Sequence, residues 1–104
     1  MAWVYLLIAG CFEVGFTTSL KLSNNFSVGK WTVAFFVCVI LSFEFLNEAT
    51  KSIPMGTAYA VWTGIGAVGT AIIGMAFFNE PTYFARIFFL VLLIGSIIGL
   101  KFVS

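Results

Sequence analysis

The chain places one carboxylate, Glu13, inside an otherwise uncharged apolar run that extends from Ala2 to Leu20. Burial disfavours the charged form of an acid, so such a group can hold a proton or a cation but not both together. A structural alternative is a permanently protonated Glu13 that is hydrogen-bonded between helices. We favour a proton- and cation-binding role, because the structural role can be filled at lower cost by uncharged residues.

Three further residues accompany Glu13 if this run is helical. Gly10 and Thr17 share its face and Phe16 lies beside it. The small residue Gly10 is expected to leave space next to the carboxylate. Because the chain contains no histidine, proton chemistry near neutral pH has to rest on a carboxylate or a lysine.

The stretch GTAYAVWTGIGAVG contains further candidate residues for the site of Glu13. Tyr59, Trp62, Thr63 and Gly66 fall on one helical face, at i, i+3, i+4 and i+7. Aromatic walls with hydrogen-bond donors suit a cation held beside a carboxylate, although Tyr59 is also placed for an interfacial aromatic belt. Gly64 and Gly66 lower the stiffness of this segment, and we predict a hinge there.

Two polar residues of the second apolar segment face opposite ways. Ser42 is placed to hydrogen-bond the Glu13 carboxylate across the interior, or only its own i−4 carbonyl. Glu44 has three interpretations: its side chain extends to the membrane–water boundary, lies against a partner subunit or forms a second protonatable site. Glu48 is expected to pair with Lys51 at i+3.

Composition indicates which solvent surrounds these residues. The chain is 62% hydrophobic and 9% charged, whereas a soluble domain has about 25% charged residues. Its four apolar segments, at about 2–20, 32–50, 57–78 and 84–103, each approach the roughly 20 residues that span a bilayer. We therefore predict an all-α membrane protein, a single domain over 1–104 with four transmembrane helices.

Several function classes are disfavoured. A net charge of +1 without a basic patch disfavours nucleic-acid binding. No nucleophile–base pair, metal-ligand cluster or phosphate-binding loop is evident, so we expect no enzyme, catalytic residue, metal site or cofactor. Cys11 and Cys38 lack metal-site spacing and are expected to be buried free thiols.

The charge distribution indicates dual topology. Lys21, Lys30 and Arg86 lie on one side of four spans, against Lys51, Lys101 and the amino terminus on the other. Lysine and arginine bias sets orientation, so this near balance predicts insertion both ways and an antiparallel dimer.

The last segment offers a helix contact for such a dimer. Gly95 and Gly99 are four residues apart, a spacing that lets helices approach closely in lipid. We predict a dimer contact there. Packing within one chain is the alternative.

Taken together, the four segments, the acid in the first and GTAYAVWTGIGAVG in the third resemble the small multidrug resistance transporters. The similarity covers the whole chain and is strongest at 54–69 and in IIGLK at 97–101. It implies an antiparallel homodimer in a bacterial inner membrane, with a heterodimer as a variant. It also implies export of cations in exchange for protons through one shared site.

The resemblance carries roles to individual residues. It implies that Glu13 is the essential carboxylate that binds proton and substrate alternately. Tyr59 and Trp62 correspond to residues that line the site, Ser42 to a hydrogen-bond partner of the glutamate, and Gly10 to the small residue beside it.

Within this family, WTGIGA and GLK are similar to the guanidinium exporter branch. Phe16 stands where that branch typically has Trp, and the Thr17–Thr18 pair resembles drug exporters. Glu44 departs from a usually apolar or aromatic position. We expect a proton-coupled exporter of guanidinium-like cations. A quaternary ammonium exporter and a non-transporting accessory subunit remain the alternatives.

Overall fold

The computed structural model describes residues 1–103 and contains four helices: α1 (Ala2–Leu22), α2 (Gly29–Thr50), α3 (Met55–Phe77) and α4 (Phe84–Val103). Each helix is long and apolar enough to cross a membrane, which confirms the predicted all-helical class. The boundaries differ from the expected ones by at most three residues, as where α2 begins at Gly29 rather than at 32.

Polar side chains and turn conformations end the helices where the sequence turns polar. The Ser23 hydroxyl donates to the Leu20 carbonyl at 2.7 Å and accepts from the Phe26 amide at 3.2 Å. Asn24 and Asn25 adopt left-handed backbone angles in this connection, with φ of 48° and 60°. Pro54 precedes α3, where its missing amide hydrogen interrupts no helical bond.

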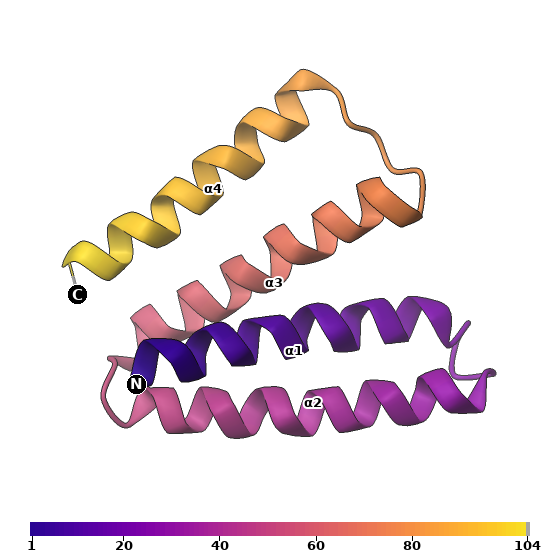
Figure 1. Cartoon of the computed structure of the whole chain (residues 1–104), viewed down its shortest axis with the longest axis horizontal. Helices are drawn as coiled ribbons and strands as arrows, with labels where there is room; N and C mark the ends of the chain where they lie inside the picture. The colour runs from indigo at the N-terminus through magenta and orange to yellow at the C-terminus, as the bar shows by residue number, and fades with distance from the viewer. Residues whose placement is uncertain (104) are drawn as a thin grey trace.

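Helix α1 lies between α2 and α3, whereas α4 packs mainly against α3. Figure 1 shows both termini and the 51–54 connection at one end, and the 23–28 and 78–83 connections at the other. Helices α3 and α4 diverge from α1 toward this second end.

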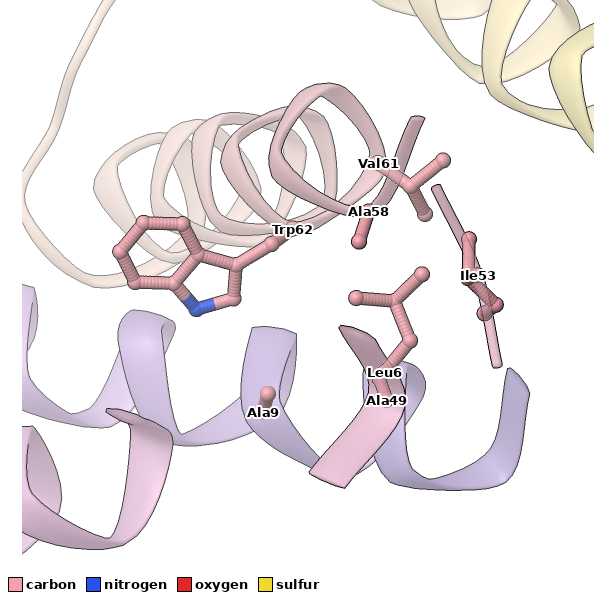
Figure 2. Packing of buried hydrophobic residues seen from close by; sticks show 7 residues of the cluster. All are labelled: Leu6, Ala9, Ala49, Ile53, Ala58, Val61 and Trp62. Atoms are coloured by element: carbon pink, nitrogen blue, oxygen red, sulfur yellow. The ribbon is translucent and has the colours of Figure 1, made fainter. Parts of the chain in front are cut away.

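The buried core is concentrated near the end that holds the termini. It joins α1, α2, the 51–54 connection and α3 (Figure 2), through Leu6, Ala9, Ala49, Ile53, Ala58, Val61 and Trp62. Three of these side chains are alanines, so the helices approach closely there.

Helix α4 buries no residue within the chain. Nothing lies within 4 Å of the position that a Cβ would take at Gly95 or Gly99, among residues 1–103. Packing of these glycines inside one chain, the alternative interpretation, is therefore wrong.

The prediction that both thiols are buried is also wrong. Cys11 is exposed and Cys38 is partly buried. Cys11 lines an apolar cavity together with Val14, Ile65 and Ile97, because its face of α1 turns toward the loosely packed α4.

Candidate functional site

Glu13 lies close to the middle of α1 and points toward α3. Its carboxyl group sits against Gly66, where a Cβ would overlap the carboxyl carbon and both oxygens. Glycine at this position is therefore what admits the carboxylate between the helices. The Oε1 atom of Glu13 is buried and has no hydrogen-bond partner among the described residues.

The carboxylate borders a cavity of about 370 Å³ that is open to the surface of the chain. This volume corresponds to about twelve water molecules at ~30 Å³ each, so it can admit a small hydrated cation. The cavity is lined by residues of α1, α3, the 78–83 connection and α4: Glu13, Thr17, Thr63, Gly66, Ala67, Thr70, Ala71, Glu80 and Arg86.

Three threonines supply hydroxyl groups to this cavity. Thr17 donates to the backbone carbonyl of Glu13 at 2.9 Å, which leaves its oxygen lone pairs as acceptors. Thr63 and Thr70 line the α3 side. Acceptor oxygens beside a carboxylate favour a cation that carries N–H donors.

The Arg86–Glu80 ion pair completes the lining at the end near the 78–83 connection. The Arg86 Nη2 atom donates to Glu80 Oε1 at 2.7 Å, with both side chains partly exposed. The Glu80 carboxyl group lies against Gly74 in the last turn of α3.

A separate hydrogen-bond network holds the three helices together beside the core. The Ser42 hydroxyl is buried and donates to the Ala9 carbonyl at 2.7 Å, while the Trp62 indole N–H donates to Ser42 Oγ at 2.9 Å. In Figure 2 the indole extends from α3 with its nitrogen toward α1. Ser42 therefore does not bond Glu13 in this structure, contrary to expectation, because its single proton is taken by the Ala9 carbonyl one turn earlier on α1.

Tyr59 lies outside the Glu13 cavity within one chain. It is 59% exposed, packs beside Trp62 with ring centroids 5.6 Å apart, and lines a different cavity together with Phe43 and Asn47. Tyr59 shares the face of Gly66 but lies seven residues earlier, about 10 Å along the axis.

Phe16 also lies outside the cavity. Its ring packs edge-on against Phe35 of α2, with centroids 5.9 Å apart. At i+3 from Glu13 it is rotated by about 60°, which turns it toward α2 rather than α3.

Comparison with known proteins decides the family. A sequence model described as Small Multidrug Resistance protein matches residues 1–93. This chain belongs to the small multidrug resistance family. It is 49% identical to a guanidinium exporter of Yersinia pseudotuberculosis over the full length of both chains. It is 41% identical, again over both full lengths, to a protein of Bacillus licheniformis named probable guanidinium efflux system subunit GdnD. A guanidinium exporter of Salmonella typhimurium is 44% identical, with 97% of this chain and 96% of that protein covered.

Family membership and the four apolar helices make the chain a multi-pass transporter of the bacterial inner membrane. Neither observation assigns roles to residues. Those roles depend on the geometry of the site.

Two glycines of this small multidrug resistance protein, Gly10 and Gly64, allow neighbouring helices to approach closely. A Cβ at Gly10 would overlap the Ile65 side chain, so Gly10 admits α3 rather than leaving room beside the carboxylate. Gly64 similarly admits Ile97 of α4, its Cβ position being 2.7 Å from the Ile97 Cδ1 atom. Helix α3 is continuous from Met55 to Phe77, and the hinge at Gly64 and Gly66 stays a prediction.

The two acids of α2 lie outside the Glu13 cavity. Glu44 is exposed on α2 and lines none of the cavities described above. Glu48 pairs with Lys51 at 2.9 Å, as the i+3 spacing predicts. Sequence analysis missed Thr70, Glu80 and Arg86 as cavity residues. Of these three, only Thr70 could have been found from the sequence, because it lies at i+4 from Gly66 on the helical face that was expected to line the site.

Proposed function

We propose that this chain is a proton-coupled antiporter that exports guanidinium or guanidinyl cations. The observation that carries the proposal is a buried, unpartnered carboxylate oxygen of Glu13 beside an open cavity in the middle of a membrane-spanning helix. A carboxylate in that position needs either a proton or a cation as its partner. The names of the similar exporters, and the WTGIGA and GLK motifs, support a guanidinium-like substrate.

Coupling follows from competition at one group. Ionised Glu13 attracts the cation from one side of the membrane, and protonation from the other side releases it. Threonine oxygens around the cavity accept the N–H donors that guanidinium carries and that quaternary ammonium lacks. No second coupling site is required.

The functional unit is an antiparallel dimer in which two copies of Glu13 share one cavity. The open face of α4, the unoccupied space beside Gly95 and Gly99, and the balanced charges of the two sides support this assembly. One chain alone leaves Tyr59 and Phe16 outside the Glu13 cavity, and we expect a second chain to bring its own copies near the shared site. A heterodimer with a chain of different sequence is the variant of this assembly.

The test uses purified protein reconstituted in liposomes. Guanidinium uptake should follow an imposed pH gradient, and Glu13→Gln should abolish it. The neutral amide neither takes up a proton near neutral pH nor offers a negative charge to the cation. Glu44→Gln is the matched control, since it changes the same group at an exposed position of α2.

Four results would redirect this proposal. Coupled uptake that survives Glu13→Gln would overturn the mechanism, and loss in Glu44→Gln alone would move the site to α2. A strong response to tetraalkylammonium compounds with none to guanidinium would favour the multidrug exporter. Phe16, which stands where the guanidinium exporter branch typically has Trp, is the residue that agrees with this alternative. Absence of transport for every cation would favour an accessory subunit.

A further inference from the structure

A second carboxylate borders the cavity of Glu13. Glu80, in the 78–83 connection, lines the same space and receives a 2.7 Å hydrogen bond from the guanidinium of Arg86. Its side chain is 39% exposed, so it is reachable from outside the cavity. Glu13, by contrast, has its Oε1 atom buried.

One row of α3 connects the two acids. Gly66, Thr70 and Gly74 follow one another at i, i+4 and i+8, the spacing of a ridge on the helix surface. The Glu13 carboxyl group lies against Gly66 and the Glu80 carboxyl group against Gly74, while Thr70 lines the cavity between them. The two glycines are about 12 Å apart along the axis. A cation moving along this row meets oxygen ligands at both ends and in the middle.

The chemistry of the Glu80 partner points to the ligand. A guanidinium group offers planar, paired N–H donors that match a carboxylate, and Arg86 presents that group to Glu80. A free guanidinium cation carries the same donors, so it can take the place of Arg86. A tetraalkylammonium cation has no N–H donor and cannot.

We propose that Glu80 is an outer binding site for guanidinium-type cations, occupied by Arg86 at rest and by the substrate on its way to or from Glu13. Exchange between Arg86 and the cation keeps the carboxylate paired throughout, which avoids the cost of an unpaired charge near the bilayer. This inference rests on the proposed function, because it assumes that the Glu13 cavity carries guanidinium.

The main test measures KM and kcat for pH-driven guanidinium uptake by the full-length chain in liposomes. Arg86→Gln frees Glu80, so KM should fall severalfold. Glu80→Gln removes the acceptor and leaves Arg86 unpaired, so KM should rise about tenfold, equivalent to about 1.4 kcal/mol. The double variant Glu80→Gln/Arg86→Gln should show no fall in KM, since the gain from Arg86→Gln depends on Glu80.

The Glu48–Lys51 pair provides the control. It has the same kind of contact, at 2.9 Å, in another connection and outside the Glu13 cavity. Glu48→Gln and Lys51→Gln should each leave the KM for guanidinium unchanged from the wild-type value. A merely structural Glu80–Arg86 pair would instead make both of its single variants fail alike, with KM changing in the same direction.

Direct binding provides a second readout that does not need transport. Titration of guanidinium chloride into Glu13→Gln protein should reveal weak residual binding. This binding should strengthen on adding Arg86→Gln and vanish on adding Glu80→Gln. If Glu80→Gln does not fold in the wild-type background, the proposal is still tested by whether Arg86→Gln strengthens the residual binding of guanidinium to Glu13→Gln protein.

The two proposals fail in different ways. Uptake that persists in Glu13→Gln overturns the antiport mechanism. Uptake that needs Glu13 but has an unchanged KM in both Arg86→Gln and Glu80→Gln, together with no residual binding in Glu13→Gln, overturns the outer site alone.

Discussion

The carboxyl group of Glu13 lies against Gly66 so closely that α3 has no room for a side chain at that position. The acid reaches the cavity only because its facing residue is glycine. This contact links a residue in the first quarter of the chain to one in the third.

Gly66→Ala should displace the Glu13 carboxyl group and lower the rate of guanidinium transport by tenfold or more. Displacing a binding group by about 1 Å can reduce a rate by orders of magnitude. Gly56→Ala is the control on the same helix, because nothing lies within 4 Å of its Cβ position. The measurement is uptake at matched protein incorporation. Equal activity of the two variants would contradict the importance of the Glu13–Gly66 contact.

Ser42→Ala should destabilise the chain by about 1–2 kcal/mol, because it leaves the Ala9 carbonyl and the Trp62 indole N–H without their shared partner. Unfolding in detergent followed by circular dichroism measures this loss. Trp62→Phe in the Ser42→Ala background should cost less than in the wild type. Ser96→Ala is the control, since Ser96 donates to the Leu92 carbonyl of its own helix. Additive losses would disprove the coupling.

Gly99→Leu should weaken the dimer, because a large side chain would hold apart two helices that meet at Gly95 and Gly99. Light scattering of the detergent-solubilised protein across a dilution series measures the shift toward monomer. Gly56→Leu adds the same side chain at a position that is also open, outside the proposed contact. A dimer that withstands Gly99→Leu but dissociates in Gly56→Leu would place the interface elsewhere.

Phe16→Trp should narrow the substrate range toward guanidinium. The indole adds an N–H donor at the position where the guanidinium exporter branch typically carries Trp. The ratio of guanidinium to tetramethylammonium transport is the readout, and it should rise. Phe12→Trp is the matched control, because Phe12 also packs against an α2 ring, that of Phe45, with 5.9 Å between centroids. A ratio that moves equally in both variants would attribute the effect to bulk.

Much of this molecule follows from its sequence. Long apolar segments cannot satisfy their backbone polar groups in lipid except as helices, so composition alone predicts four spans. A lone acid in such a segment is costly enough to single out Glu13. The Glu48–Lys51 pair is local, at i+3, and needs only helical geometry.

The neighbours of Glu13 and Ser42 were decided by tertiary structure. Between helices in lipid, no hydrophobic force selects which faces meet, so periodicity does not determine their relative rotation and offset. The sequence allows Ser42 to bond either Glu13 or its own i−4 carbonyl, whereas in the structure it donates to the Ala9 carbonyl instead. Helix packing also places Glu80 of a connecting segment on the cavity of Glu13, a proximity between residues 67 positions apart that no local pattern encodes.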